Sequence, residues 1–508
     1  MTRDLLPLDQ LLARQAERIP RRTYIKFEGK RYTFREMDRL ASAFSAFLRQ
    51  QGAKRGDRVA LLSCNCHWYV AAYFGIIRSG CVVLPINNLL THEEVGFILK
   101  DAGVFLVFHD AECTSTVDKL RQSGHRFAGF AEAVREGASA PASAFPPTAV
   151  DDVSTILYTS GTTGRPKGAL LTHRNIAANA LAALDAIHIT QKDRFIVFLP
   201  LFHSFTYTVC VVLPLITGSL ISLLPGVRPF QRVVKSLIVD RITLFVAIPT
   251  VYKILAEKNM PWFVKLLLNL RLCISGAAPL PPKVIREFEA AFKVPLREGY
   301  GLTEASPVVS FNRIEVDRQK PGTVGLPLPG ISVRTIGEDG KDVPSGTPGE
   351  LLVRGPNVMR GYLNRPEDTA ATVVDGWLHT GDIAALDDEG FIKIIDRKKD
   401  LIIVDGLNVY PYEVEEVLYR HPAIQDCSMI GVPHEHEEGK ELGIMYVVLK
   451  EGAAATAKEL RDYLAQHVAH YKIPRRFIFS SEMPRTATGK IMKKELRNWY
   501  RDNESKRS

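Results

Sequence analysis

Ile156-Leu-Tyr-Thr-Ser-Gly-Thr-Thr-Gly-Arg-Pro-Lys-Gly168 is the stretch that decides the fold, and Ala169-Leu-Leu-Thr-His173 follows it directly. Residues Val153 to Tyr158 have the apolar character of a short buried strand. The loop after this strand, Thr159 to Gly164, contains only hydroxyl-bearing residues and glycine. Because these residues are small, backbone N–H groups and hydroxyls can approach a polyanion closely. The sequence therefore predicts a buried strand followed by a phosphate-binding loop.

The candidate phosphate ligands share this loop: Thr159, Ser160, Gly161, Thr162, Thr163 and Gly164. Lys167 adds a mobile cation at the edge of the loop. A Gly/Ser-rich connection without function is the alternative, but the density of hydroxyls, the spaced glycines and the Pro-Lys-Gly exit favour phosphate binding. The loop is not a Walker A sequence, because Pro166 precedes Lys167 and Gly168 follows it.

Residues Tyr158 to Lys167 closely resemble the AMP-binding signature of the adenylate-forming superfamily, which includes acyl-CoA synthetases, nonribosomal-peptide adenylation domains and firefly luciferase. Further motifs follow in the family's order over about residues 150 to 490. The resemblance implies an α/β fold, with a large N-terminal domain over residues 1–398 and a small, mobile α+β domain over residues 399–508. Its parallel sheets would be sandwiched by helices.

Length and composition agree with one large and one small domain, since 508 residues exceed the usual size of a single domain. The seven cysteines are widely spaced, apart from Cys64 and Cys66, and show neither a disulfide framework nor a zinc site. The first residues mix acidic and basic side chains and are not a signal peptide. We therefore expect a cytoplasmic protein.

One segment challenges the interpretation of the chain as a soluble protein. No charged residue lies between Arg194 and Arg228, and Val209 to Leu224 is nearly all apolar. A membrane-spanning helix needs about 20 apolar residues in one run. This segment is divided by residues that interrupt such a run: Pro200, His203, Pro214 and Gly218. We predict a strand, a helix and a strand inside an α/β core, with a membrane span as the alternative.

The N-terminal part alternates helical and strand patterns. Leu8 to Glu17 has helical spacing, and a hairpin is expected around Glu28-Gly29. Thr33 and Glu36 form a capping-box pattern before a helix that reaches Gln50. Strands at 58–62 and 81–86 then flank a helix at 68–79, and residues 138–150 are a loop candidate. This alternation predicts parallel sheets with helices on both faces.

Two further sites follow the phosphate loop. His203 stands in Leu199-Pro-Leu-Phe-His203, where a structural histidine is the commoner meaning; the family carries Pro-Leu-Phe-His near its acyl and pantetheine channels. The strand expected at 272–275 runs into the small residues Gly276 and Ala277. Ligands of parallel sheets bind at such strand ends, although close packing of the turn is an equal alternative. The resemblance assigns Gly276 and Ala277 to the adenine site.

Glu298-Gly-Tyr-Gly-Leu-Thr-Glu304 is the second motif. Gly299 and Gly301 free the backbone around Tyr300, whose ring can stack on a purine. Thr303 offers a hydroxyl and Glu304 a hard oxygen ligand suited to Mg²⁺. Alone, this segment could be a helix N-terminus capped by Thr303. It resembles the family's Tyr-Gly-x-Thr-Glu, in which the glutamate binds magnesium; we also assign Thr159 to the metal and Glu298 to the nucleotide site.

The third motif, Gly376-Trp-Leu-His-Thr-Gly-Asp382, offers a carboxylate for ribose hydroxyls, which is the role of Thr-Gly-Asp in the family. Asp396-Arg-Lys-Lys-Asp400 has the composition of a solvated charge run. The resemblance instead implies that Arg397 also reaches the ribose and that Lys399 is the hinge between the domains. Asp405 replaces a glycine of the family's next motif.

The C-terminal part closes with Pro484-Arg-Thr-Ala-Thr-Gly-Lys490-Ile. The family places its adenylation lysine here, which implies that Lys490 is catalytic. From Lys472 onward the chain has eleven Lys or Arg residues and four Asp or Glu residues, so this tail is basic. A solvated surface, a nucleic-acid patch or a membrane patch would explain it, as would the phosphates of CoA. His434-Glu-His436 is interpreted as a solvated loop rather than a metal site.

These motifs imply a two-step ligase that uses ATP, Mg²⁺ and CoA and activates a small carboxylic acid as acyl-AMP. A strand is expected from Thr243 to Pro249. The expected acyl walls, Phe202 to Val212 and Phe245 to Val251, are apolar and free of arginine and lysine. They favour a medium- or long-chain fatty acid, with an aromatic acid or a carrier-protein acceptor as alternatives, and a non-catalytic nucleotide binder as another class. No nucleic-acid partner is expected, whereas peripheral membrane contact and a homodimer stay open.

Overall fold

The computed structural model describes residues 5–139, 148–159, 166–257, 262–315, 319–404, 407–433, 441–486 and 489–504. The chain forms two compact units, the first made of Met1–Val333 and Val353–Leu378, the second of Arg334–Leu352 and His379–Ser508. Contacts within the chain define these two units. The predicted domain boundary between residues 398 and 399 is instead the proposed hinge about which the C-terminal domain rotates, and it stays a prediction.

The first unit begins as its local sequence patterns predict. Helix α1 (Leu8–Arg18) precedes the hairpin of β1 (Thr23–Phe27) and β2 (Lys30–Thr33), and α2 spans Phe34–Gln50. The Thr33 hydroxyl accepts a hydrogen bond from the Glu36 amide, and the Glu36 carboxylate accepts one from the Thr33 amide. This reciprocal cap explains why the helix begins here.

One sheet of the first unit has the spatial order β15-β14-β13-β12-β11-β9-β10-β1-β2. Besides β1 and β2, its strands are β9 (Arg194–Val197), β10 (Leu220–Leu223), β11 (Leu244–Ala247), β12 (Leu272–Ser275), β13 (Leu296–Gly301), β14 (Val308–Phe311) and β15 (Leu326–Pro327). The strands from β1 to β13 in this order pair in parallel. Their carboxyl ends therefore lie along one edge, where ligands of such sheets bind.

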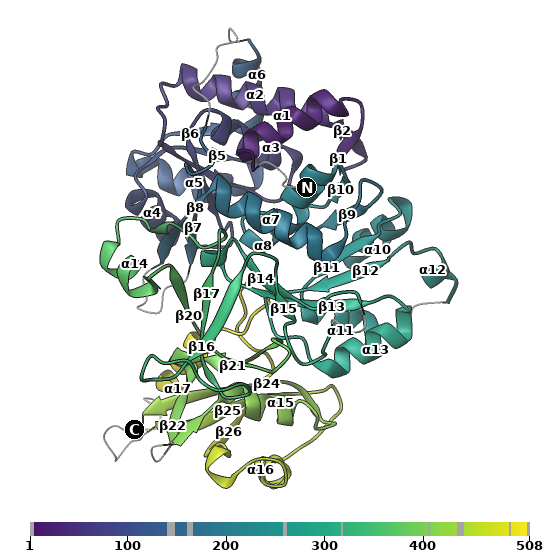
Figure 1. The fold of residues 1–508 in the computed structure, drawn as a ribbon, viewed down its shortest axis with the longest axis vertical. Helices are drawn as coiled ribbons and strands as arrows, with labels where there is room; N and C mark the ends of the chain where they lie inside the picture. Colours follow the sequence, from purple (N-terminus) through teal and green to yellow (C-terminus); the bar gives the residue numbers. More distant parts are fainter. Residues whose placement is uncertain are drawn as a thin grey trace. The chain divides into compact units, whose positions relative to one another are not determined.

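Helices α10 (Phe230–Val239), α11 (Pro249–Glu257) and α13 (Pro282–Phe292) pack on this sheet (Figure 1). Their apolar side chains share one core with β9, β11 and β12, which includes Leu237, Tyr252 and Phe288. The strand expected over 243–249 ends earlier, at Ala247, and Pro249 begins α11 instead. Proline suits the first turn of a helix because its missing N–H has no helical partner there.

A second sheet has the order β18-β8-β7-β4-β3-β5-β6. Its strands are β3 (Arg58–Leu62), β4 (Val82–Ile86), β5 (Val104–His109), β6 (Phe127–Gly129), β7 (Val153–Thr159), β8 (Lys167–Thr172) and β18 (Gly361–Tyr362). Helices α4 (His92–Asp101) and α5 (Thr114–Leu120) pack their apolar side chains against β3, β4 and β5. Helices α3 (His67–Arg78) and α6 (Phe130–Ala138) complete this part, while residues 140–147 of the expected loop lie outside the described residues.

The long uncharged segment forms a strand, helical turns and a strand, as expected. Between β9 and β10 lie α8 (Ser204–Tyr207), a π-helical turn (Thr208–Val212) and α9 (Leu213–Thr217), with α7 (His173–Ile187) preceding β9. Val211, Val212 and Leu213 are fully buried. Among the helices that the structure describes, none has the length and apolarity that crossing a bilayer requires.

The second unit has an α+β core around the sheet β24-β25-β26, with β24 at Ile424–Pro433, β25 at Glu441–Leu449 and β26 at Arg476–Phe479. Helices α15 (Pro411–Leu418) and α16 (Ala457–Ala465) pack on the sheet side chains that include Met429 and Met445. Helix α17 (Lys493–Glu504) packs through Leu496 and Trp499 on the alternate side chains, which include Ile430 and Ile444. The α+β character predicted for this part of the chain is confirmed.

The remaining helices and strands are α12 (Trp262–Leu266), α14 (Pro366–Thr372), β16 (Ser332–Ile336), β17 (Gly349–Arg354), β19 (Val373–Val374), β20 (Trp377–Leu386), β21 (Ile392–Arg397), β22 (Ile402–Val404) and β23 (Leu407–Val409). Figure 1 shows α12 at the outer border of the first unit. Strands β20 and β21 pair antiparallel and place Asp382 directly opposite Arg397. Two residues fifteen positions apart in sequence thus become neighbours.

Candidate functional site

The phosphate loop lies between two paired strands. Strand β7 ends at Thr159, β8 begins at Lys167, and these two residues are direct partners in an antiparallel pair. The hairpin therefore brings the two ends of the loop together. The predicted ligands within it, Ser160, Gly161, Thr162, Thr163 and Gly164, lie outside the described residues.

Lys167 already has an anionic partner. Its Nζ lies 2.7 Å from Oδ1 of Asp368 and 5.5 Å from the centre of the Tyr362 ring. The side chain of Lys167 is largely covered, with 15% exposed. An incoming phosphate must therefore compete with Asp368 for this ammonium group, which makes Lys167 less mobile than the sequence suggested.

Glu304 lies beside the phosphate loop, as the motif order predicted. Its Oε1 accepts hydrogen bonds from the Thr159 hydroxyl at 3.3 Å and from the Tyr362 hydroxyl at 3.0 Å. Burial, followed by the charge of Glu304, raises the pKa of the Tyr362 hydroxyl, so this hydroxyl stays a donor. Thr159 and Glu304, our two candidate metal ligands, are thus brought together by tertiary structure.

Tyr362 is a site residue that the sequence analysis missed. It belongs to β18, whose residues Gly361 and Tyr362 pair with Leu170 and Ala169 of β8. This pairing carries the tyrosine ring to the phosphate hairpin from a position nearly two hundred residues later in the chain. A glycine followed by tyrosine after an arginine is too common a pattern to have marked it.

The Gly-Tyr-Gly segment continues β13 rather than beginning a long helix. Gly301 must be glycine, because an added Cβ would lie 2.1 Å from the Pro307 carbonyl oxygen. Tyr300 between the glycines is half-buried. Thr303 starts a single 3₁₀ turn capped by Leu302, so the alternative of a helix capped by Thr303 is wrong.

Glu298 and the turn after β12 form one unit. The Glu298 carboxyl accepts a hydrogen bond from the Leu280 amide at 2.9 Å, and burial raises its pKa to about 8. Gly276 faces the Phe205 ring, since a Cβ there would lie 2.9 Å from the ring. Ala277 has a positive φ of 67°. Glu298 therefore holds the turn that carries the two residues proposed for adenine.

The N-terminus of helix α8 fixes the position of His203. It precedes α8, and its Nδ1 accepts a hydrogen bond from the Phe205 amide at 3.2 Å. Burial lowers the pKa of His203 to about 4, so the ring is neutral at pH 7 with its proton on Nε2. Ser204, the next residue, lies 3.5 Å from Thr303, measured between the two hydroxyl oxygens. The histidine thus stands close to the Thr303–Glu304 turn.

In the second unit, Asp382 and Arg397 form an ion pair, with Nε and Oδ1 3.2 Å apart. The Asp382 side chain is nearly covered, whereas 43% of the Arg397 side chain is exposed. The two predicted ribose-binding residues are therefore adjacent. Lys399 follows in a 3₁₀ turn, and burial, then Arg397, lowers its pKa. Asp405 lies outside the described residues.

Lys490 belongs to the same electrostatic group. Burial, then Arg397, lowers the pKa of its ammonium to about 8, while Asp382 and Asp400 act in the opposite direction. Its amide donates to the Thr486 hydroxyl at 3.1 Å, and its carbonyl accepts from the Thr486 amide at 2.8 Å. A tight turn therefore carries the lysine, and the structure brings it to the predicted ribose and hinge residues.

A buried charge cluster supports this turn. Lys493, the first residue of α17, lies 3.0 Å from Glu415, measured between Nζ and Oε1. Asp400 accepts a hydrogen bond from Arg497 at 2.9 Å, and Asp396 accepts one from the Tyr412 amide at 2.7 Å. Asp396 and Asp400 are both buried. The interpretation of residues 396–400 as a solvated run holds for the exposed Lys398 and Lys399. It is wrong for Asp396 and Asp400, whose carboxylates accept hydrogen bonds from α15 and α17.

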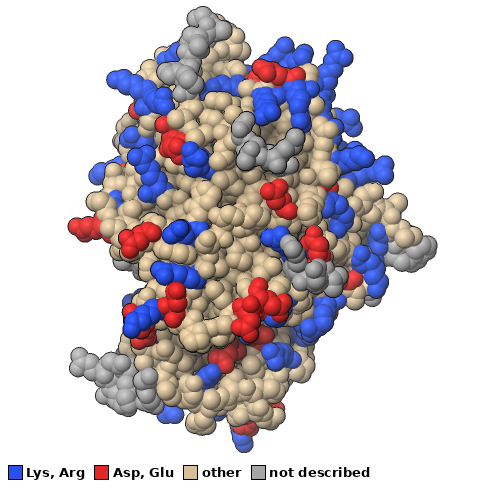
Figure 2. Space-filling view, viewed as in Figure 1, with Lys and Arg blue, Asp and Glu red and all other residues tan. Residues whose placement is uncertain are grey.

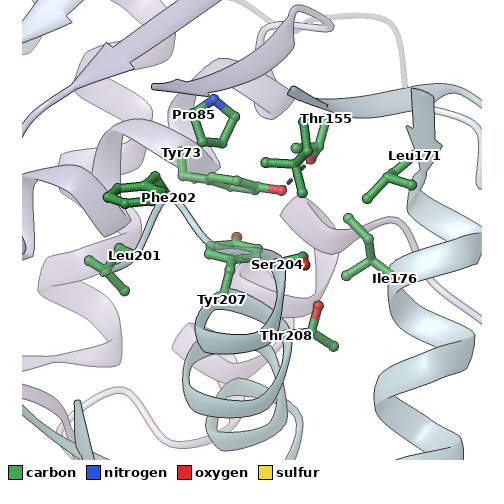
Figure 3. Close-up of a pocket in the computed structure, with 11 residues that line it drawn as sticks. Tyr73, Pro85, Thr155, Leu171, Ile176, Leu201, Phe202, Ser204, Tyr207 and Thr208 are labelled. Carbon is green, nitrogen blue, oxygen red and sulfur yellow. Dashed lines mark hydrogen bonds between the residues drawn. The ribbon is translucent and has the colours of Figure 1, made fainter. Parts of the chain in front are cut away.

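A small cavity of about 10 Å³ adjoins α8 (Figure 3). Apolar and hydroxyl side chains line it: Tyr73, Pro85, Thr155, Leu157, Leu171, Ile176, Leu201, Phe202, Ser204, Tyr207 and Thr208. The Tyr73 and Tyr207 rings stack with centroids 3.9 Å apart, and the Tyr73 hydroxyl is hydrogen-bonded to Thr155. None of these lining residues is charged. Residues 202–208 thus supply a wall, whereas Phe245, Ala247 and Val251 pack in the core of the first sheet.

Other candidate metal ligands do not converge. In the part of the chain that the structure describes, no group of three His, Cys, Asp or Glu residues could hold a metal ion. His434 and His436 lie outside the described residues. Glu304 and Thr159, with substrate phosphates as further ligands, remain our candidates, and such a sparse protein contribution is typical of Mg²⁺.

Comparison with known families decides the relationship. The family described as AMP-binding enzyme matches residues 12–363, and the AMP-binding enzyme C-terminal domain matches residues 413–490. The chain belongs to the AMP-binding enzyme family. It is therefore an AMP-forming acid–thiol ligase that uses ATP, Mg²⁺ and CoA, as the adenylate-forming resemblance implied.

Known AMP-binding enzymes resemble this one over nearly its whole length. A long-chain-fatty-acid–CoA ligase of Bacillus subtilis is 35% identical, with 96% of this chain and 94% of that protein covered. A feruloyl-CoA synthase of an Amycolatopsis species is 36% identical, with coverages of 96% and 98%. The crystal structure of ATP-bound MatB from Rhodopseudomonas palustris has a TM-score of 0.90 at 32% identity, covering 97% and 99%. Both curated relatives join an acid to CoA, but the acids differ.

Proposed function

We propose that this AMP-binding enzyme activates a medium- or long-chain fatty acid, C8 to C16, and transfers it to CoA. First, a carboxylate oxygen of the acid attacks the α-phosphorus of ATP, and pyrophosphate leaves with the bridging oxygen. Then the CoA sulfur attacks the acyl carbonyl carbon, its proton is lost, and AMP leaves. The observation that carries the choice of acid is the uncharged, largely apolar wall formed by residues 201–208 and their neighbours (Figure 3).

The wall favours a monocarboxylic acid. A second carboxylate would need a cation or several donors to replace its hydration. The lining offers apolar groups and hydroxyls instead, with Leu157, Ile176 and Phe202 among them. The cavity is small, so an acyl chain must displace side chains such as Tyr207 from its path. Each methylene that becomes buried then contributes about 0.8 kcal/mol.

An aromatic acid is the second candidate. The stacked rings of Tyr73 and Tyr207 form a flat aromatic border to the cavity, and a planar acid could extend that stack (Figure 3). The similarity to feruloyl-CoA synthase supports this alternative as strongly as the similarity to the fatty-acid ligase supports the first. The choice between a fatty acid and an aromatic acid therefore depends on which side chains move to enlarge the cavity.

We assign the site residues to the steps as follows. Glu304 and Thr159 hold Mg²⁺, which when bound neutralises charge on the phosphate oxygens. The loop from Thr159 to Gly164 and Lys167 bind the β- and γ-phosphates. Asp382 and Arg397 hold the ribose, and Lys490 stabilises the negative charge that develops at the α-phosphate.

The remaining assignments concern the base and the second step. Gly276, Ala277 and Tyr300 bind adenine, and Glu298 fixes the turn beside them through its bond to the Leu280 amide. Thr303 offers its hydroxyl to a phosphate, and the neutral His203 lies near the acyl and pantetheine channels. The C-terminal domain turns about Lys399 before CoA enters. The location we propose is the cytoplasm, because all seven cysteines, each a described residue, are free thiols.

Substrate choice is tested with the purified enzyme. Initial rates of pyrophosphate release are measured for saturated acids from C4 to C18, benzoate, ferulate and malonate, with AMP and ADP quantified in the same samples. We expect kcat/KM to rise by up to roughly fourfold per methylene until the pocket is full. A flat response to chain length with a preference for ferulate or benzoate would establish the aromatic alternative. A preference for malonate would overturn both.

A further inference from the structure

The starting edge of the first sheet carries a row of basic residues. Strands β1, β10, β9, β11, β12 and β13 pair in parallel, so all of them begin at one edge. At least one basic residue stands at or just before the start of most of these strands. We call the following set the basic rim: Arg18, Arg22, Lys192, Arg194, Arg241, Arg271 and Lys293. The opposite edge leads to Gly276 and Glu304.

The charge of the rim is compensated only in part by its neighbours. Within the edge, the buried Asp193 pairs with Arg271 of the rim, whereas the buried Asp240 pairs with Lys26, which lies outside the rim. Exposed carboxylates border it at Glu17 and Glu257 but are outnumbered. Figure 2 shows Lys and Arg gathered along the border of the first unit where Figure 1 places β9, β10, α10 and α12.

Like charges within the rim act on Arg22. Burial, then the charges of Arg194 and Arg18, lowers the pKa of its guanidinium. Its Nη2 donates to the Gln191 carbonyl, which fixes the group at the edge. Like charges held together in this way are a cost to the fold unless an anionic partner compensates them.

Large aliphatic side chains stand exposed at the same edge. Leu266 ends α12 and Leu267 follows it, in the segment that leads to β12, with 74% and 53% of these residues exposed. Val239 ends α10, just before Arg241, with 59% exposed. Lys265 lies 5.3 Å from the centre of the Phe292 ring next to Lys293, so the ends of α12 and α13 are neighbours. Basic and apolar groups therefore occur together along one edge.

We propose that the basic rim, with Val239, Leu266 and Leu267, docks the enzyme on the anionic surface of a lipid bilayer. Basic residues near such a surface and aliphatic side chains inserted into its interface are the two contributions that hold peripheral proteins. The surface lies at the edge away from Gly276 and Glu304, so docking leaves that edge of the sheet free. The proposal goes beyond the proposed function and does not depend on the acid that is activated.

Two other occupants fit less well. Nucleic acid would use the basic residues but would leave the exposed leucines in water, since phosphate contacts are electrostatic. A second copy of this chain would bring two basic rims together around a symmetric interface, where like charges repel. Both are outcomes of the test below.

The test is flotation of the full-length enzyme with vesicles of phosphatidylcholine alone or of phosphatidylcholine and phosphatidylglycerol at a ratio of about 7:3. We expect binding to the anionic vesicles, weak binding to the neutral ones, and release in salt near 1 M, where the Debye length falls to about 3 Å. Arg241→Gln with Lys293→Gln should weaken binding on the order of fivefold for each charge removed. Leu266→Ser with Leu267→Ser should weaken it on the order of tenfold or more.

Matched controls use exposed residues elsewhere. Leu89→Ser removes an equally exposed leucine, and Lys119→Gln with Lys450→Gln removes two exposed charges. These controls should bind anionic vesicles as the unaltered enzyme does. All variants should keep their thermal unfolding midpoint and their rate of pyrophosphate release, because the altered side chains are exposed and lie outside the proposed ATP site.

Several outcomes would overturn the proposal. Failure of the enzyme to float with anionic vesicles would do so. Binding that both rim variants retain would show that this surface is not the contact. Tight binding of a single-stranded oligonucleotide that depends on Arg241 and Lys293 but not on the leucines would assign the rim to nucleic acid. Light scattering that shows a dimer broken by the leucine variants would assign it to a second copy.

Discussion

Replacing Lys493 by methionine removes the ammonium group that pairs with the Glu415 carboxylate in the interior of the second unit. Lys493 Nζ lies 3.0 Å from Glu415 Oε1, and Glu415 also accepts a hydrogen bond from the Met429 amide at 2.7 Å. Burial alone would lower the pKa of Lys493, but Glu415, Asp396 and Asp400 raise it above its ordinary value. The ammonium group thus compensates three carboxylates.

The structure sets the expected cost. Removing one partner of a buried pair destabilises a protein by about 3–5 kcal/mol, because a charge stays buried without compensation. The side chains of Lys493 and Glu415 retain 17% and 11% exposure, which places the cost near the lower limit, about 3 kcal/mol. Burial already raises the pKa of the Asp396 carboxyl while the charge of Lys493 lowers it, so loss of the lysine raises this pKa further. The loss of stability should therefore be smaller at pH 5, where a proton can bind, than at pH 8.

Hydrogen exchange followed by mass spectrometry measures this loss where it occurs. Amides of β24, β25 and α17 should exchange faster in Lys493→Met, by roughly 10²-fold at pH 8 if local opening controls exchange. Lys494→Met is the matched control, because Lys494 is the adjacent residue, carries the same charge and is exposed. It should leave exchange in these elements unchanged.

The same change should affect the first half-reaction. Lys493 stands three residues after Lys490 and anchors the start of α17, so its loss frees the turn that carries the proposed catalytic lysine. Lys493→Met should slow acyl-AMP formation about tenfold, Lys493→Arg should restore most of it, and Lys494→Met should have no effect. Equal exchange in Lys493→Met and Lys494→Met, or no recovery with arginine, would refute the role given to this cluster.

Three other predictions concern single residues. Lys490→Ala should slow acyl-AMP formation by roughly 10²-fold or more but spare thioester formation from supplied acyl-AMP and CoA. Lys399→Pro should spare acyl-AMP formation and slow thioester formation. Equal loss of both half-reactions in both folded variants would contradict this division. Since only the protonated Lys490 can stabilise the α-phosphate and its pKa is about 8, kcat/KM for adenylation should fall as pH rises through 8, while a profile flat to pH 9.5 would exclude that role. Gly301→Ala would place a Cβ 2.1 Å from the Pro307 carbonyl oxygen and should cost about 3 kcal/mol in thermal unfolding, with Gly226→Ala, where nothing lies within 4 Å, close to neutral.

Local signals made much of the fold predictable. The capping box at Thr33 and Glu36, the buried strand before the phosphate loop and the alternation of strands with helices all act over a few residues, so the sequence alone shows them. The strand expected over residues 243–249 was too long, because Pro249 suits both a strand end and a helix start. The strand itself was predicted correctly, and only its end was placed too far along the chain.

The candidate site was predictable in its residues more than in their contacts. Motif order marked Thr159, Glu304 and Asp382, and the structure brings the first two within hydrogen-bonding distance. Tyr362 had no comparable signal, since its contact with Glu304 depends on the pairing of β18 with β8. A strand pair between distant segments is determined by packing rather than by the residues on either side.

The sequence by itself therefore determined the family, the reaction class and most of the chemical groups involved, because small loops, glycines and invariable side-chain chemistry can be recognised wherever they lie. Only the tertiary structure decided the environment of the charges. Asp396 and Asp400 have the composition of a solvated run, yet α15 and α17 bury them beside Lys493. An aspartate has the same side chain whether it is exposed or buried. The free energy of its charged form differs because distant segments of the chain surround the buried carboxylate with a low-dielectric environment.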